Sequence, residues 1–166
     1  MRRARAIRGA SVGLALGGLA AAATHATEVH KIKKVAKEHK EVRVWGYVSI
    51  KDTCESRGPV EIYLDEAPKG GTVCMRQGNV RLTSLWDPSS KKQHCLGKRI
   101  SGVWVIYVPY ASFTGNDAVR YTVKNHDAVT RTYEAEIRVE WGSNTTSSPP
   151  EPQKAGPMPV CPALIS

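Results

Sequence analysis

Apolar and polar residues alternate with a period of two through the middle of the chain, which is the pattern of half-buried β-strands. The alternation is clearest near the end of this region, where five apolar and five polar residues alternate. One run is apolar at every position, as expected for a central strand that is covered on both faces. The predicted strands are residues 41–50, 60–64, 71–75, 79–85, 102–108, 118–124 and 132–141.

These about seven strands predict one all-β domain over residues 41–141. Gly, Pro, Asn and Asp separate the strands, and Gly78-Asn79 indicates a turn between the third and the fourth. We therefore expect an antiparallel β-sandwich, with a closed barrel as the alternative. The period also places Trp45 and Tyr47 on the non-core face of the first strand.

The segments on either side of this domain have different compositions. Residues 27–40 are charged and lack a wide apolar stripe, so we expect a flexible, solvated leader. Residues 142–166 contain six of the ten prolines. Since proline has no amide donor for a sheet, we expect a Pro-rich tail or linker that is flexible, and extended where it is ordered.

The first 26 residues have the order of parts of a secretory signal peptide. Four arginines come first, a small and apolar run covers residues 10–23, and Thr24-His25-Ala26 supplies small residues for cleavage. We expect cleavage after Ala26 or after Ala23, with an uncleaved anchor as the alternative. The apolar run is shorter than the about 20 residues of a spanning helix, which favours cleavage. The protein is then secreted or periplasmic and has no membrane span.

Export changes how the charge is interpreted. Without the four arginines of the signal segment, which has no acidic residue, 20 basic and 15 acidic residues remain, a net charge of +5. A moderate, scattered charge argues against a nucleic-acid partner. Outside the cytosol, the polyanions that a basic protein meets are surface polysaccharides and anionic lipid headgroups.

All four cysteines follow the signal segment: Cys54, Cys74, Cys95 and Cys161. An even number in an exported chain predicts two disulfides. Three pairings are possible, and we slightly favour Cys74 with Cys95, because these residues flank the predicted hairpin and its loop. Cys54 with Cys161 would then hold the tail. None of the spacings is that of a CxxC redox or zinc motif.

Residues 107–123 join two of the strands through a polar, turn-rich segment. Pro109 ends one strand, and Phe113, the chain's only phenylalanine, is expected to fill the end of the sandwich. Asp117 is expected to accept backbone N–H groups of the turn. Tyr121 is placed where its hydroxyl would bond back to the loop, as in a tyrosine corner. The segment is interpreted as mainly architectural.

The same segment resembles the bacterial cadherin-like and immunoglobulin-like repeats of large surface proteins. The similar residues are Tyr107, Pro109, Phe113, Gly115, Asp117, Tyr121 and Val123, together with the upstream turn of residues 67–73. The resemblance covers residues 60–141 and implies an immunoglobulin-like β-sandwich. Such repeats come in tandem and lack cysteine, whereas this chain has one copy and four cysteines.

The sequence offers no recognisable catalytic machinery, so no enzyme is predicted. HExxH, GxSxG and paired-histidine motifs are absent from it. His94 and Cys95 are adjacent, but neighbours on an extended chain point to opposite sides, and a disulfide would remove the thiolate. No cofactor is expected. Calcium is the weak alternative, with Asp117 and Asp127 as candidate ligands, although turn capping by these aspartates is favoured.

The densest basic feature lies in the predicted loop after residue 85. Lys91, Lys92, Lys98 and Arg99 accompany Trp86 there, so the loop is either an ordinary solvated loop or a contact surface for an anionic polysaccharide. The leading functional hypothesis is an exported, non-catalytic module that binds an envelope or extracellular protein. Polysaccharide binding is the alternative, and a secreted inhibitor comes last.

Overall fold

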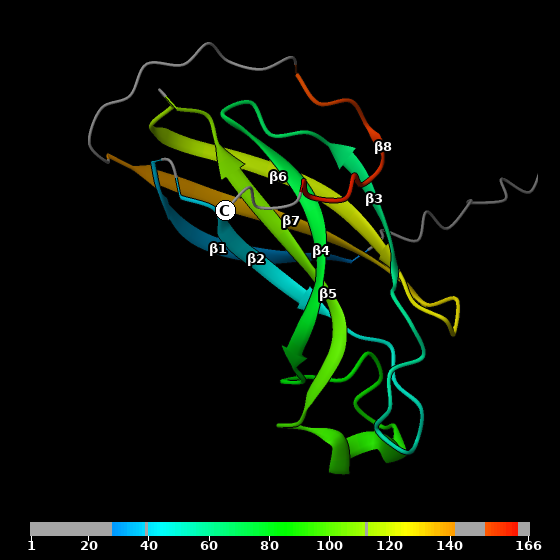
Figure 1. Cartoon of the computed structure of the whole chain (residues 1–166). Coiled ribbons are helices and arrows are strands. Elements are labelled where there is room, and N and C mark those ends of the chain that lie inside the picture. Colours follow the sequence, from blue (N-terminus) through cyan, green and yellow to red (C-terminus); the bar gives the residue numbers. More distant parts are fainter. Residues whose placement is uncertain (1–27, 39, 112, 142–151, 163–166) are drawn as a thin grey trace, which may run out of the picture.

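The computed structural model describes residues 28–38, 40–111, 113–141 and 152–162, which form two β-sheets packed as a sandwich (Figure 1). The predicted signal peptide lies outside the described residues. The elements are β1 (Val29–Lys37), β2 (Val42–Tyr47), β3 (Glu61–Glu66), β4 (Gly71–Arg81), the 3-10 helix η1 (Lys91–Cys95), β5 (Arg99–Pro109), β6 (Gly115–Lys124), β7 (Thr130–Glu140) and β8 (Gly156–Pro157).

One sheet has the strand order β1-β7-β6-β3-β8 and the other has the order β2-β5-β4. Neighbouring strands are antiparallel, except that β1 pairs parallel to β7. The predicted all-β sandwich is confirmed. It contains eight strands in the described part of the chain, in place of about seven.

The core lies between the sheets and follows the predicted alternation. In β7, Ala135, Ile137 and Val139 are at most 3 % exposed, and the residues between them point outward. The outward residues include Glu136, which forms an ion pair with Lys33 of β1. Burying each aliphatic side chain of this kind stabilises the fold by about 1.5–3 kcal/mol. Burial of one face per strand therefore fixes the register of the sheet.

The prediction of a flexible leader over residues 27–40 is wrong for its larger part, because β1 forms an edge strand there. Ile32 and Ala36 are buried against the core, and His30 pairs with Tyr133 of β7. Only two apolar residues occupy the inward positions, and lysines occupy most of the other positions of the strand. The alternation of apolar and polar residues is therefore hard to recognise in the sequence. Lysine is common on sheet edges because it discourages pairing with other chains.

The predicted turn at Gly78-Asn79 is also wrong. β4 continues through both residues and pairs with β5 over its whole length, with Gly78 opposite Gly102. A Cβ atom at Gly78 would lie 3.3 Å from the Trp104 ring, so this glycine leaves room for the indole across the strand. Glycine inside a strand often marks such a close approach.

A register shift in β2 reverses the face on which Tyr47 lies. The shift falls between Arg43 and Trp45, so that both Val44 and Tyr47 reach the core, at 0 % and 3 % exposure. The expectation that Tyr47 lies on the non-core face is therefore wrong. An extra residue in one strand of a pair is a β-bulge, and it exchanges the faces of the residues that follow.

A second apolar cluster lies beyond the sandwich, at the far end of the β4–β5 pair (Figure 1). Its buried members are Val48, Ile50, Cys54, Val80, Leu82, Cys95 and Ile100. Cys54 and Cys95 form a disulfide within it. We call residues 48–57 and 82–98, with the adjoining ends of β4 and β5, the disulfide pole.

Residues 152–162, which we call the strap, cross the open side of the sandwich from β3 to β4. Pro157 of β8 pairs with Tyr63, Met158 is buried at 2 %, and Val160 bridges to Met75. The strap thus belongs to both sheets, although proline was expected to keep it out of them. Pro157 fits because β8 is a short edge strand.

The strap is joined to β4 by the second disulfide, Cys74–Cys161. Two disulfides are confirmed, but the favoured pairing, Cys74 with Cys95 and Cys54 with Cys161, is wrong. That pairing assumed a hairpin at Gly78, and β4 is straight there. In the described part of the chain, no helix is long and apolar enough to cross a membrane.

Candidate functional site

Asp117 fixes one end of the sandwich. Its carboxylate accepts hydrogen bonds from the backbone N–H groups of Lys69, Gly70 and Ala118, at 2.9 Å each, and from the Tyr107 hydroxyl at 2.8 Å. Turn capping by Asp117 is confirmed, although two of the N–H groups belong to the turn between β3 and β4. The carboxylate is therefore occupied by donors, which a calcium ion would have to displace.

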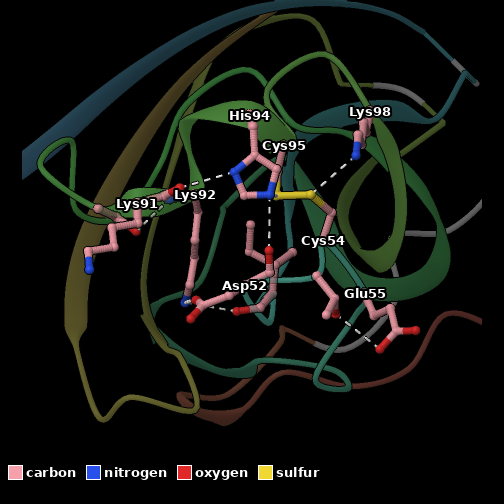
Figure 2. Close-up of a disulfide and its surroundings, with 11 residues drawn as sticks. Asp52, Cys54, Glu55, Lys91, Lys92, His94, Cys95 and Lys98 are labelled. Atoms are coloured by element: carbon pink, nitrogen blue, oxygen red, sulfur yellow. Dashed lines mark hydrogen bonds and ion pairs between the residues drawn. A yellow bond between two sulfur atoms is a disulfide. The ribbon is translucent and has the colours of Figure 1, made fainter.

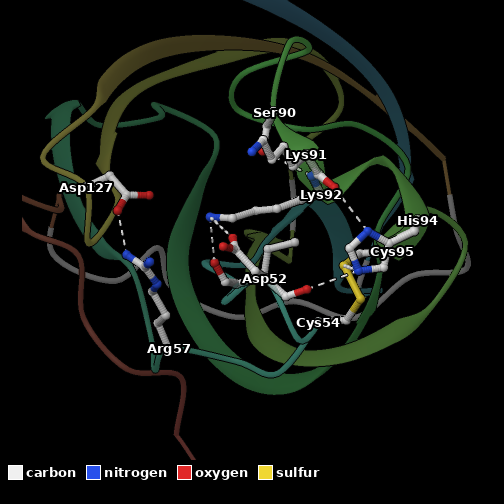
Figure 3. Close-up of polar contacts among 10 residues, drawn as sticks. Asp52, Cys54, Arg57, Ser90, Lys91, Lys92, His94, Cys95 and Asp127 are labelled. Atoms are coloured by element: carbon white, nitrogen blue, oxygen red, sulfur yellow. Dashed lines mark hydrogen bonds and ion pairs between the residues drawn. A yellow bond between two sulfur atoms is a disulfide. The ribbon is translucent and has the colours of Figure 1, made fainter.

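Asp127, the other calcium candidate, follows the opposite end of β6 and forms an ion pair with Arg57 (Figure 3). The structure does not bring the two aspartates together. Asp127 and Arg57 are both partly exposed, and ion pairs of this kind contribute little to stability.

The residues of the resemblance gather around Asp117. Phe113 packs against the main core, and a Cβ atom at Gly70 would lie 2.3 Å from its ring, so only glycine fits beneath it. Pro109 ends β5, and Gly115 begins β6 with φ 116°. These positions agree with the predicted architectural role.

Tyr121 does not form the predicted bond to the loop. Its hydroxyl lies 2.8 Å from the Tyr47 hydroxyl inside the core, and the bond at the corner is made by Tyr107 instead. Tyr121 sits in the middle of β6, too far along the strand to reach the turn. Burial raises the pKa of both Tyr47 and Tyr121 above the ordinary value of 10.0.

The Cys54–Cys95 disulfide has a basic side chain beside each sulfur (Figure 2). The Lys98 ammonium lies 3.3 Å from the Cys54 sulfur, and Nε2 of His94 lies 3.5 Å from the Cys95 sulfur. His94 and Cys95 were expected to point apart, which is wrong because they lie on η1 and not on an extended chain. The sulfur and nitrogen atoms of Cys54, His94 and Cys95 lie within 4.8 Å of one another.

His94 also holds two segments of the pole together. Its Nδ1 lies 3.0 Å from the carbonyl oxygen of Lys91, and its Nε2 lies 3.0 Å from the carbonyl oxygen of Asp52 (Figure 2). A carbonyl oxygen only accepts hydrogen bonds. The ring therefore faces two acceptors, one from η1 and one from the loop that carries Cys54.

The predicted basic surface is divided between inward and outward side chains. Lys92 donates to the carbonyl oxygen of Ile50 at 2.9 Å and lies 3.8 Å from the Asp52 carboxylate (Figure 3). Lys98 contacts the disulfide. Lys91 and Arg99 are exposed, and with the residues that the structure describes their side chains make no ion pair. Two of the four cations are thus used within the pole.

Trp86 is a structural residue as well. Its indole N–H donates to the carbonyl oxygen of Val48 at 3.0 Å, and the Arg131 guanidinium lies 5.4 Å from its ring. The ring also lies 6.3 Å from that of Tyr47, between centroids. Trp86 therefore joins the pole to the main core and does not form the expected exposed contact beside the lysines.

An apolar groove of about 600 Å³, which the sequence analysis missed, opens below the strap between β3 and β4. Its apolar side chains come from both strands, from β5 and from the strap. They are Val60, Ile62, Tyr63, Met75, Val103, Met158 and Val160. Two of them are well exposed, Tyr63 at 42 % and Val160 at 70 %. We call this surface the strap groove.

The outer edge of β4 borders the strap groove and is only partly paired. The side-chain amide of Gln153 bonds both the N–H and the carbonyl of Val73, and the strap backbone bonds both groups of Met75. In an edge strand, the backbone N–H and carbonyl of every second residue point away from the neighbouring strand. Gln77 therefore directs both groups outward, as Val73 and Met75 do. With the described residues, these two groups have no backbone partner. The edge ends at Asn79, whose carbonyl accepts from the Trp104 indole at 3.3 Å.

Comparison with protein-family models, curated proteins and solved structures found no match for this chain. The function is therefore argued from the strap groove, the open part of the β4 edge and the disulfide pole. Of these, the strap groove combines an apolar surface with backbone groups that no described residue pairs, which is the combination that protein ligands use.

Proposed function

We propose that this chain is an exported, non-catalytic module that binds an extended segment of another envelope or extracellular protein. The segment adds to the edge of β4 at Gln77 and places apolar side chains in the strap groove. This is recognition by strand addition, in which backbone hydrogen bonds give affinity and side-chain pockets give specificity. The observation that carries the proposal is the backbone of Gln77, which pairs with no described residue on its outer side, beside the apolar groove.

The strap indicates the chemistry of the partner. It lies extended along β3 and β4, contains proline, and inserts one apolar side chain, Met158, between the sheets. The groove is also lined by Pro157, Met158 and Val160 of the strap. The strap groove therefore adjoins the surface on which the strap itself lies. We therefore infer an extended, apolar, proline-tolerant polypeptide as the occupant. Its affinity should be in the micromolar range (~−8 kcal/mol), because few backbone groups are open.

Export is part of the proposal and is supported by two features. Both disulfides join distant parts of the chain, and such bonds persist in oxidising compartments. The basic and apolar start of the chain has the pattern of a secretory signal. A partner that meets this surface would then be a periplasmic or secreted protein.

The test is selection of peptides from a random phage-displayed library on the oxidised chain from Thr27 onward, which contains every described residue. The affinity of a selected peptide is measured by fluorescence anisotropy, and its binding site is mapped by changes in the NMR chemical shifts of the protein. We expect the largest shifts at Gln77 and Asn79 and at the methyl groups of Met75 and Met158.

Two substitutions test the proposed peptide-binding site without disturbing the core. Gln77→Pro removes the outward N–H, and Val160→Arg places a charge at the exposed rim of the groove. Each should weaken binding by about tenfold or more, since each removes about 1.4 kcal/mol or more of interaction. Val35→Arg, on the exposed face of the opposite edge strand, is the matched control and should leave binding unchanged.

Two further outcomes bear on the proposal. Peptides that bind Gln77→Pro as tightly as the original chain would show that strand addition at β4 is wrong. A chain that ends at Pro162 tests whether the last four residues compete for the edge. The proposal predicts equal or tighter peptide binding by this shorter chain, whereas loss of binding would make those residues part of the site and would contradict it.

A further inference from the structure

We propose that the disulfide pole, when Cys54–Cys95 is reduced, binds one Cu⁺ ion through the sulfurs of Cys54 and Cys95 and Nε2 of His94. The inference concerns a different surface from the strap groove and does not depend on the proposed function. It rests on the position of three ligand atoms, on the surroundings of His94 and on the packing that holds the two segments together.

The three ligand atoms suit a soft cation. They lie within 4.8 Å of one another, and two sulfurs that bind one ion at about 2.3 Å each stand up to about 4 Å apart. Opening the disulfide into a metal site therefore requires side-chain rotation and no rearrangement of the backbone. Thiolate and imidazole are the ligands that select Cu⁺ and Zn²⁺ over hard cations.

His94 is oriented as a metal ligand is. Its Nδ1 lies 3.0 Å from the carbonyl oxygen of Lys91, and a contact of this kind usually fixes the orientation of a metal-binding histidine. Its Nε2 lies 3.0 Å from the Asp52 carbonyl oxygen and 3.5 Å from the Cys95 sulfur. A metal ion bound at Nε2 would therefore take the place of the contact between Nε2 and Asp52.

The pole has other contacts that keep the two cysteines together after reduction. Ile50 and Ile100 pack in the second apolar cluster, and the Lys92 ammonium bonds the carbonyl of Ile50 across the two segments. The loop that carries Cys54 is closed by a bridge between Ile50 and Ser56. Reduction therefore leaves two thiols and an imidazole in place, and a pre-organised site binds metal more tightly than a flexible one.

The charges favour Cu⁺ over Zn²⁺. Two thiolates and one Cu⁺ carry a net charge of −1, which the Lys98 ammonium beside Cys54 neutralises. Two thiolates and one Zn²⁺ are neutral, so the exposed Lys98 ammonium gains no opposite charge from a zinc site. Cu⁺ is also satisfied by three ligands, whereas Zn²⁺ takes four.

The chemical steps balance with a dithiol as reductant. The dithiol transfers two electrons and two protons to the disulfide, giving two protein thiols and the oxidised, cyclic dithiol. Binding of Cu⁺ then releases both thiol protons to solvent, and the copper keeps its oxidation state. The ion must therefore be supplied as Cu⁺.

The experiment uses the chain from Thr27 onward, reduced with dithiothreitol and freed of it under nitrogen. Cu⁺ is titrated in competition with bicinchoninate, and binding is followed by thiolate-to-copper absorption in the ultraviolet. We expect one ion per chain. Amide spectra recorded before and after reduction should retain the signals of Ile50 and Ile100, and their loss on reduction would contradict the proposal.

Variants separate this site from the other cysteine pair. Cys54→Ser/Cys95→Ser retains Cys74 and Cys161 and should lose the bound ion. Loss of an outer-shell partner alone costs about 10–100-fold in metal affinity, so loss of a direct ligand in His94→Ala should weaken Cu⁺ binding by at least about tenfold. His126→Ala is the control, because this histidine lies in the loop between β6 and β7, and it should bind Cu⁺ as the original chain does.

Lys98→Met tests the charge argument. It should weaken Cu⁺ binding several-fold and should not weaken Zn²⁺ binding, since only the copper site carries a net negative charge. Two results would overturn the proposal: Cu⁺ binding that is insensitive to His94→Ala, or Zn²⁺ binding tighter than Cu⁺ in the reduced chain.

Discussion

The two ends of the β4–β5 pair are held by different means. At the end where Gly71 faces Pro109, the carboxylate of Asp117 collects four hydrogen bonds from three segments of the chain. At the other end, where Arg81 faces Arg99, a disulfide and a second apolar cluster hold the loops. One end depends on a single buried side chain, and the other divides the same task between a covalent bond and five other buried residues.

This difference decides how each end should respond to substitution. A disulfide stabilises mainly by restricting the unfolded chain, so its loss need not change the folded structure. A buried carboxylate stabilises the folded state itself, because its donors have no other acceptor. Substitutions at the two ends can therefore have similar free energies and different structural effects.

The largest expected effects come from loss of the two disulfides, and the one at the pole bears directly on the comparison of the two ends. Cys54→Ser/Cys95→Ser should lower the free energy of unfolding by about 4 kcal/mol, which is the loop-closure entropy for a separation of 41 residues. The amides of Arg57 and Ile100 should remain protected from hydrogen exchange at neutral pH, because Arg57 donates to the carbonyl oxygen of Ser49 and Ile100 pairs with Val80. Urea unfolding and exchange measurements test both statements.

The strap disulfide gives the comparison for that variant. Cys74→Ser/Cys161→Ser opens a separation of 87 residues and should cost about 4.6 kcal/mol. Here the amide of Met158 should lose protection, because Met158 is the strap's one buried side chain and the other strap contacts are backbone and side-chain hydrogen bonds at a sheet edge. Equal loss of protection in the pole and the strap would show that the second apolar cluster does not hold the pole by itself.

The next effect is at the opposite end. Asp117→Ala leaves the Gly70 N–H and the Tyr107 hydroxyl, both buried, without an acceptor, and should cost about 3 kcal/mol. Unlike the pole variant, it should expose the amides of Lys69 and Gly70 to exchange. Asp127→Ala, which removes a surface ion pair, should cost under about 1 kcal/mol. A loss of the same size for both aspartates would remove the contrast between the two ends.

The Asp117 end could be predicted from sequence as far as its parts are local, which excludes the bonds from Lys69 and Gly70. Tyr107 and Asp117 are ten residues apart, and Phe113 lies between them. Such local signals predict the same structure in most β-proteins. They include turn residues, a proline that ends a strand, and an aspartate whose side chain bonds nearby backbone groups. Only the role of Tyr121 was assigned wrongly, because the sequence does not show which tyrosine hydroxyl faces the turn.

The pole, β1 and the strap were not predictable in the same way. Cys54 pairs with Cys95 because residues 48–57 cross the end of β5, and no local pattern indicates that crossing. β1 is a strand because β7 offers a free edge, although its own inward positions are half polar. The strap groove depends on the open side of a sandwich whose strand order the sequence does not give.

The smallest effect concerns Tyr47, which joins the main core to the pole. Tyr47→Phe leaves the buried Tyr121 hydroxyl without its partner and should cost about 1–2 kcal/mol. Tyr47→Phe/Tyr121→Phe should recover part of this loss, since two phenyl rings need no hydrogen bond. Tyr63→Phe, at an exposed tyrosine, is the control and should change nothing.

The dependence on pH sharpens the same test. Burial raises the pKa of Tyr47 and Tyr121 above 10.0, so above pH 10 the unfolded chain loses protons that the folded chain keeps. The free energy of unfolding then falls as the pH rises. In the double variant this fall should be less steep between pH 10 and 12. Tyr107, Tyr110 and Tyr133, whose pKa values are also raised, contribute to the slope that remains. An unchanged slope in urea titrations over this range would mean that the two hydroxyls ionise in the folded protein as they do in the unfolded one. That result would contradict the burial of the Tyr47 hydroxyl between the core and the pole, which its 3 % exposure indicates.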